Sequence, residues 1–170
     1  MIEVESQGTI IRKDLFISSP DTTNNRMALC GAIAVFAILS QKRHRLAVTY
    51  VSDSQYLVKG MTEWVPTWKS RGWTRKGGKL ENVDLWQVLD RTAAAHDVRW
   101  EWVRGHAGHP KNEFADRLAV QAATQLLNSD GTVPSEFDGW LADRQQHQQF
   151  EDYDADLAFA ELVAQTEETV

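Results

Sequence analysis

The sequence predicts an α/β protein in which a mixed sheet is flanked by helices. Three runs carry the strand signal: residues 8–18 and 46–52 are rich in β-branched side chains, and residues 98–103 alternate between apolar and polar. Apolar residues at helical spacing indicate helices over 28–41, 82–96 and 110–127. Strands that come first and then alternate with helices are typical of a mixed α/β sheet.

The individual elements follow from local patterns. Residues 2–5 alternate, and we expect them to pair across Gln7-Gly8 with the strand over 8–18. A polar cluster at 18–25 is a turn that caps the helix over 28–41. Residues 46–52 are almost continuously apolar or β-branched, which predicts a central, buried strand. A short helix follows at 54–60, and Pro110 fits the first position of the last long helix.

The charge of the chain is divided unevenly. The whole sequence carries a net charge of −6, but residues 1–128 carry +4 and residues 129–170 carry −10. We therefore predict a mildly basic domain over 1–128 and an acidic, Gln-rich extension over 129–170 that is partly helical or disordered. A mildly basic face is compatible with nucleic acid as a partner.

The composition excludes two classes of protein. Cys30 is the single cysteine, so an intramolecular disulfide cannot form. No apolar run approaches the ~18 residues that a membrane-spanning helix needs. We expect a cytoplasmic protein without a membrane partner.

Two acidic residues and one histidine are candidates for catalysis. Asp53 follows the strand over 46–52, where ligand sites of α/β sheets gather, and Asp116 lies on the helix that begins at Pro110. The alternatives are a helix cap at Asp53 or Ser54 and a solvated helix residue at Asp116. His106 precedes that helix and is a candidate proton shuttle, or else a loop histidine without a role.

Two further groups of residues suit nucleic acid. Asn24 and Asn25 offer amides and backbone N–H groups at a helix start, or they only cap that helix. The segment over 64–79 combines tryptophans with basic residues, which is typical of a surface that stacks on bases and contacts phosphates. Alternatively, Trp64 and Trp68 pack in the core. The basic residues are Lys69, Arg71, Arg75, Lys76 and Lys79.

In combination, these segments resemble the ribonuclease HI family from about Phe16 to about Ala123. The matching words are Thr22-Thr-Asn-Asn-Arg-Met27, Asp53-Ser-Gln-Tyr56, Trp68-Lys-Ser-Arg-Gly-Trp73, Asn82-Val-Asp-Leu-Trp86 and Trp100-Glu-Trp-Val-Arg-Gly-His-Ala-Gly-His-Pro110. The resemblance implies a five-stranded mixed sheet flanked by helices. It also implies cleavage of the RNA strand of an RNA/DNA hybrid, with two Mg²⁺ ions held by four carboxylates.

The resemblance assigns roles to residues of this chain. Asp53 and Asp116 match two of the metal-binding carboxylates, and His106 matches the mobile catalytic histidine. Asn24, Asn25 and Gln55 match residues that contact the hybrid. Trp64 and the basic residues after it match the substrate-binding handle. The implied cofactor is Mg²⁺, or Mn²⁺, and the implied partner is an RNA/DNA hybrid or duplex nucleic acid.

The chain departs from the family at two places. Ala28 stands where the family has a glutamate, and the family's first strand, which carries a metal-binding Asp, has no counterpart. That strand is missing, truncated or rebuilt, and residues 1–18 begin at the family's second strand. Two Mg²⁺ ions ~4 Å apart need several anionic oxygens. We therefore expect a degenerate active site that binds Mg²⁺ weakly, in a protein that binds hybrid or duplex while cleavage is lost or severely impaired.

Two alternatives stay open. In one, the chain is an active ribonuclease H with a rewired site, in which Glu3 or Glu5 joins Asp53, Asp116 and His106. In the other, it is a non-catalytic scaffold that recruits a partner protein. A missing central strand would leave a sheet edge unpaired, and such an edge favours a homodimer.

Overall fold

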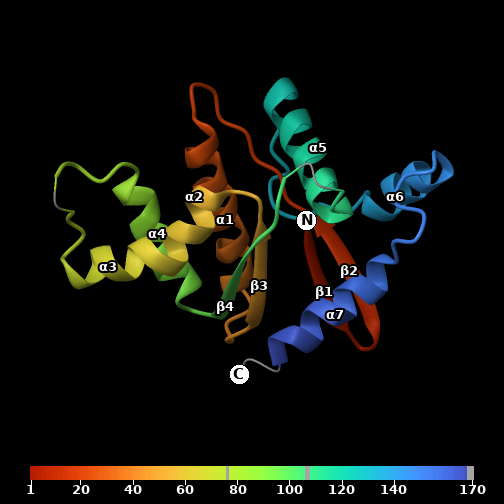
Figure 1. Ribbon diagram of the computed structural model, residues 1–170, viewed down its shortest axis with the longest axis horizontal. Helices are drawn as coiled ribbons and strands as arrows, with labels where there is room; N and C mark the ends of the chain where they lie inside the picture. The colour runs from red at the N-terminus through yellow and green to blue at the C-terminus, as the bar shows by residue number, and fades with distance from the viewer. Residues whose placement is uncertain (76, 106–107, 168–170) are drawn as a thin grey trace. The chain divides into compact units, whose positions relative to one another are not determined.

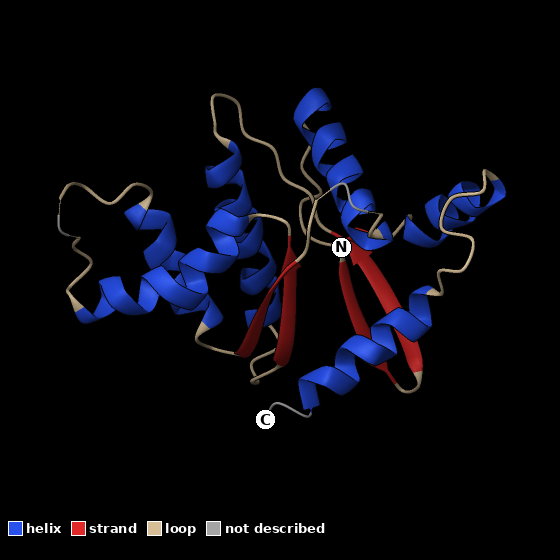
Figure 2. Ribbon diagram, viewed as in Figure 1, coloured by secondary structure: helices blue, strands red, loops and turns tan. Residues whose placement is uncertain are grey.

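The computed structural model describes residues 1–75, 77–105 and 108–167 and divides into two compact units (Figure 1). The first unit comprises Met1–Pro20 with Arg104–Val170, and the second comprises Asp21–Val103. Each unit contains helices and a sheet of its own (Figure 2). The predicted α/β class is therefore confirmed.

A β-hairpin opens the first unit. β1 (Ile2–Ser6) pairs antiparallel with β2 (Thr9–Asp14) across Gln7 and Gly8, whose φ angles are 53° and 76°. Two central residues with positive φ make the turn type that fits the twist of hairpin strands. β5 (Val133–Pro134) pairs with the end of β2. A strand is thus present at the N-terminus, which corrects the expectation that the first strand is missing.

Three helices complete the first unit: α5 (Pro110–Gln125), α6 (Phe137–Gln146) and α7 (Ala155–Glu167). As predicted, Pro110 begins α5. An aromatic core joins α5 to α6, since the Phe114 ring lies 5.3 Å from Phe137 and 5.5 Å from Trp140 between centroids. Much of the acidic extension is therefore folded onto α5, while a domain boundary at residue 128 stays a prediction.

Arg12 on β2 ties the hairpin to two helices of the extension. Its side chain is 8% exposed, and its guanidinium donates to Glu3 at 2.9 Å, to Asp138 on α6 at 2.9 Å and to Asp156 on α7. Lys111 on α5 approaches the same Glu3, with Nζ 2.7 Å from Oε2. Two carboxylates of the extension are thus engaged by a buried arginine of the hairpin.

We expect Arg12→Ala to lower the free energy of unfolding by about 2 kcal/mol, because it removes the buried side chain that joins the hairpin to α6 and α7 and leaves Glu3 with Lys111 as its remaining cation. Arg45→Ala is the matched control, since Arg45 pairs with Asp97 and both side chains are mostly exposed. Urea denaturation followed by circular dichroism measures both variants. The prediction fails if Arg12→Ala shifts the midpoint no more than Arg45→Ala does.

The second unit packs helices against a parallel pair of strands. β3 (Ala47–Ser52) and β4 (Asp97–Trp102) run parallel, with Ala47 opposite Asp97 and Ser52 opposite Trp102. The helices α1 (Asn24–Ser40) and α4 (Val83–Ala93) pack on each other and enclose the core of this unit. Phe36 from α1 and Trp86 from α4 are fully buried in that core.

The chain remains helical from Gln55 to Ser70. α2 (Gln55–Lys59) continues through a π-helical turn, η1 (Gly60–Trp64), into α3 (Val65–Ser70). The sequence predicts a short helix over 54–60, followed by a segment over 64–79 that combines tryptophans with basic residues. The helix continues because Trp64 and Trp68 recur one turn apart and pack together, with Trp68 also 5.8 Å from Trp86 between centroids. These two tryptophans thus pack largely against other aromatic rings, as in the alternative that places them in the core.

The strands of the described residues form two sheets. One is antiparallel with the order β1-β2-β5, and the other is the parallel pair β3-β4. The described residues thus contain antiparallel strand pairs in the first unit and a parallel pair in the second. Across the part of the chain that is described, no helix has the length and apolarity needed to cross a membrane.

Candidate metal and nucleic-acid site

Asp53 lies directly after β3, at the carboxyl end of the parallel pair. Its side chain is exposed, and its backbone carbonyl accepts a hydrogen bond from the indole N–H of Trp102 at 3.0 Å. The cap of α2 is Ser54, whose Oγ accepts from the Leu57 N–H at 3.2 Å. Since Ser54 performs the capping, Asp53 remains a candidate metal ligand.

Two other positions of the second unit bear on that candidate. Ala28 on α1 is half-buried and packs against the core, so its methyl group adds no ligand. Gln55 is exposed at the first residue of α2, two positions after Asp53. The side chain predicted to contact the hybrid therefore belongs to the same strand end as the candidate ligand.

The start of α1 presents two exposed amides. Thr23 is the N-cap, and its hydroxyl oxygen accepts from the Arg26 N–H at 3.3 Å. Asn24 and Asn25 follow in the first turn with exposed side chains. Because Thr23 performs the capping, these amides suit the nucleic-acid contacts predicted for them.

A hydrogen-bond network connects the helices of the second unit. The Tyr56 hydroxyl accepts from Asn82 Nδ2 at 3.1 Å and from Trp86 Nε1 at 3.2 Å. Arg26 donates to the Asn82 side-chain oxygen at 2.9 Å. The four residues of the network lie within Thr22–Met27, Asp53–Tyr56 and Asn82–Trp86, but the sequence pattern does not show that they are bonded to one another. This hydrogen-bond network connects the starts of α1, α2 and α4 and holds them in place relative to each other.

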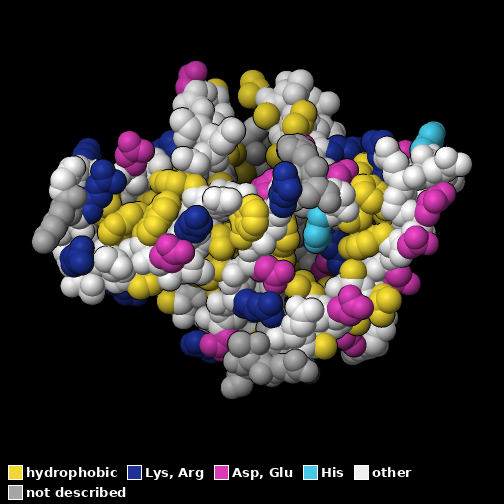
Figure 3. All heavy atoms as spheres, viewed as in Figure 1, with side chains coloured by type: hydrophobic (Ala, Val, Ile, Leu, Met, Phe, Trp, Pro, Cys, Tyr) yellow, Lys and Arg dark blue, Asp and Glu magenta, His cyan; other side chains and the backbone are white. Residues whose placement is uncertain are grey.

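The predicted handle is a basic surface braced by tryptophans. Trp64 is half-buried, with its ring centroid 5.7 Å from that of Tyr56. Lys69 pairs with Asp90 on α4 at 2.9 Å, whereas Arg71, Arg75 and Lys79 have exposed side chains. Lys and Arg side chains gather on this part of the surface, at the left of Figure 3. Lys76 lies outside the described residues.

The other catalytic candidates belong to the first unit. Asp116 is exposed on α5, and His106 lies outside the described residues. His109 is the N-cap of α5, because its Nδ1 accepts from the Asn112 N–H at 3.3 Å. Asp53 and Asp116 thus lie in different units, and the described residues contain no group of three or more His, Cys, Asp or Glu side chains arranged to hold a metal ion.

The two glutamates of β1 differ in their surroundings. Glu3 is 10% exposed and forms ion pairs with both Arg12 and Lys111. Glu5 is exposed on the same strand. Because two cations already neutralise the Glu3 carboxylate, it is a poor metal ligand, and the rewired site that includes Glu3 gains no support.

Comparisons with known proteins give a consistent result. The sequence profile of the RNase H family matches residues 5–124. The chain is 50% identical over 117 residues to "Ribonuclease H" of Pseudomonas savastanoi pv. phaseolicola, a match that covers 68% of this chain and 76% of that protein. It is 46% identical over 115 residues to "Ribonuclease HI" of Pseudomonas aeruginosa PAO1, which covers 67% and 76%.

A solved structure is similar as well. It is the crystal structure of LC9-RNase H1, described as a type 1 RNase H with the type 2 active-site motif. The TM-score is 0.77 at 46% sequence identity, and the match covers 82% of this chain and 68% of that chain.

These matches overturn one expectation from the sequence. The chain was expected to bind hybrid or duplex nucleic acid with cleavage lost or severely impaired. Proteins that share 46–50% of its residues over two thirds of its length are named for ribonuclease activity. The active alternative therefore accounts for the comparisons better than the binding-only interpretation does.

Proposed function

The chain belongs to the RNase H family, and we propose that it hydrolyses the RNA strand of RNA/DNA hybrids in a Mg²⁺-dependent reaction. The observation that carries this proposal is the family match over residues 5–124. That range includes Asp53, Asp116 and every residue predicted to contact nucleic acid. Type 1 members of the family use Mg²⁺ and bind RNA/DNA hybrids.

The substrate would be held by the second unit. Asn24, Asn25 and Gln55 present exposed amides at the starts of α1 and α2. Such amides donate to phosphate and sugar oxygens and accept from base edges. The basic surface after Trp64 adds cations that favour the nucleic-acid backbone.

The carboxylates of Asp53 and Asp116 are the residues that would hold Mg²⁺, since both are exposed and carboxylate oxygen is a ligand that Mg²⁺ prefers. When bound, the metal supplies Lewis-acid activation of the phosphodiester and of the attacking water. His106 is the proposed proton carrier, because an imidazole gains and loses a proton near neutral pH.

We infer that the ligand set of this chain is smaller than the four carboxylates of the family. In support, Ala28 offers a methyl group, and Glu3 is engaged by two cations. Asp53 and Asp116 would then hold Mg²⁺ weakly, and oxygens of the substrate phosphate would add to its ligands.

The proposed activity is tested with a hybrid whose RNA strand carries an end label. We expect RNA cleavage with Mg²⁺ or Mn²⁺ and none in EDTA, while the DNA strand and an RNA duplex of the same sequence stay intact. The rate should keep rising with Mg²⁺ into the millimolar range. An intact hybrid at saturating Mg²⁺ and Mn²⁺ would refute the proposal.

We expect Ala28→Glu to raise the cleavage rate at limiting Mg²⁺ by about tenfold, because it adds a carboxylate to a site short of anionic ligands. Ala37→Glu is the matched control, since Ala37 is exposed on the same helix. Initial rates on the labelled hybrid measure both variants. Equal rates for the wild type and Ala28→Glu would contradict the smaller ligand set.

The cytoplasm remains the predicted location of the protein. We also propose a homodimer that forms through an unpaired edge of β1 or β3. An exposed strand edge presents N–H and C=O groups that a second chain can pair with. Light scattering during size-exclusion chromatography measures the mass. A single species of 19.3 kDa would end this proposal.

A further inference from the structure

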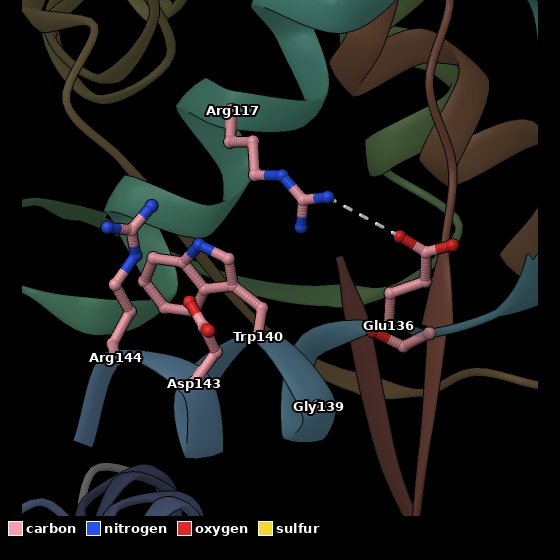
Figure 4. Close-up of a pocket in the computed structure, with 7 residues that line it drawn as sticks. Arg117, Glu136, Gly139, Trp140, Asp143 and Arg144 are labelled. Atoms are coloured by element: carbon pink, nitrogen blue, oxygen red, sulfur yellow. Dashed lines mark ion pairs between the residues drawn. The ribbon is translucent and has the colours of Figure 1, made fainter. Parts of the chain in front are cut away.

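A hollow between α5 and α6 brings together hydrogen-bond donors that the proposed catalysis does not use. Its volume is about 650 Å³, and it is lined by Arg117 on α5 and by Trp140 and Arg144 on α6. In Figure 4 the two arginines come from different helices toward the same space, on either side of the Trp140 indole. All of these residues belong to the first unit.

Both guanidinium groups are held against aromatic rings of the core. The Cζ of Arg117 lies 5.9 Å from the Phe114 ring centre, and the Cζ of Arg144 lies 5.7 Å from that of Trp140. Phe114 is fully buried and Trp140 is 9% exposed. Because a cation over a fixed ring loses freedom before any ligand binds, the two charges are preorganised.

The Trp140 indole N–H is a donor without an acceptor. Its nitrogen is buried and has no hydrogen-bond partner among the described residues. Buried polar groups are nearly always paired, so an orphaned donor requires an explanation. In Figure 4 the indole nitrogen lies on the side of the ring that faces the two guanidinium groups. An acceptor that enters between the arginines reaches this donor once it displaces the atoms that cover the nitrogen.

Two carboxylates at the edge of the hollow do not accept a hydrogen bond from the Trp140 indole. Glu136 Oε2 lies 3.7 Å from Arg117 Nη2, which is longer than a hydrogen bond, and the Glu136 side chain is 72% exposed. Asp143 also lines the hollow and lies 3.8 Å from His147 Nδ1, with both side chains mostly exposed. Solvated carboxylates held this loosely can be displaced by an anion that meets both arginines.

We propose that this hollow binds a phosphate group, which accepts hydrogen bonds from Arg117, Arg144 and the Trp140 indole N–H. Guanidinium forks match the geometry of phosphate oxygens and bind them in pairs. The phosphate is either inorganic phosphate or part of a nucleic-acid backbone. This site is independent of the proposed cleavage, because it needs neither metal nor hydrolysis.

The test follows the indole N–H resonances of the ¹⁵N-labelled protein by NMR during titration with inorganic phosphate, in EDTA and at constant ionic strength. Trp140→Phe identifies the Trp140 resonance among those of the 7 tryptophans. We expect a saturable shift of that resonance. Arg117→Gln and Arg144→Gln should each raise the apparent Kd about tenfold, as expected for the loss of one charged donor. Arg91→Gln, an exposed arginine on α4, is the matched control and should leave the Kd unchanged.

A second titration with an uncleaved RNA/DNA hybrid in EDTA separates the two sources. A shift of the same resonance that inorganic phosphate reverses assigns the site to the nucleic-acid backbone. A response to inorganic phosphate alone assigns it to the free ion. No shift with either ligand, or a shift that both arginine variants retain at unchanged Kd, would overturn the proposal. Failure of the cleavage assay would leave this result unaffected.

Discussion

Asp53→Asn is expected to reduce Mg²⁺-dependent cleavage by about a thousandfold, because metal-assisted attack supplies most of the rate in this type of reaction. The substitution keeps the size of the side chain and removes only its charge. Asp116 is the one other carboxylate proposed to hold the metal. The proposed site therefore has no further carboxylate that could take the place of Asp53. Asp53 is exposed, and Ser54 rather than Asp53 caps α2, so the substitution leaves this cap in place.

The measurement compares initial cleavage rates with hybrid affinity in EDTA. Affinity should stay nearly unchanged, because the proposed grip lies on Asn24, Asn25, Gln55 and the basic surface after Trp64. Asp130→Asn is the matched control, since Asp130 is exposed in a loop at φ 48°, a conformation that Asn adopts readily. Cleavage by Asp53→Asn at the wild-type rate would remove Asp53 from the proposed site.

The elements predicted best from the sequence are those with strong local patterns. The β-branched run at 46–52 became β3, the alternating run at 98–103 became β4, and Pro110 marks the start of α5. In each case the residues that carry the sequence pattern are the same residues that form the element. The helix through Gly60 was missed because its packing partner, Trp86, lies on a later helix.

The folding of the extension was harder to predict for a physical reason. Arg12 bonds Asp138 and Asp156, which are 126 and 144 positions away along the chain. Periodicity shows which face of a helix is apolar, but it does not show which element that face meets. The hollow between α5 and α6 depends on the same long-range packing and carries no signal in the sequence.

The candidate site was predicted as a set of residues rather than as an arrangement. The sequence placed Asp53 at a strand end and Asn24 and Asn25 at a helix start, and the structure has them there. It gave too much weight to Ala28 in predicting lost cleavage. The absence of a carboxylate at position 28 lowers the number of metal-binding oxygens that the chain supplies. The cleavage rate also depends on metal-binding oxygens that the substrate supplies.

Gly60→Ala is expected to lower the free energy of unfolding by about 3 kcal/mol, because it forces a methyl group into a filled space. A Cβ at position 60 would lie 2.0 Å from Cη2 of Trp86 and 2.6 Å from its Cζ3. Trp86 is fully buried, donates to the Tyr56 hydroxyl and packs against Trp68. It therefore cannot retreat without disturbing the core of the second unit.

Gly31→Ala in the same unit provides the matched control. Gly31 lies within α1, and a Cβ added there meets nothing within 4 Å. Since Ala is the better helix former, this variant should be more stable than the wild type by about 0.5–1 kcal/mol. Gly60 has a helical φ of −56°, so backbone strain does not contribute at either position. Urea denaturation should thus give shifts of opposite sign, and equal stabilisation by both variants would show that Trp86 does not require a glycine at position 60.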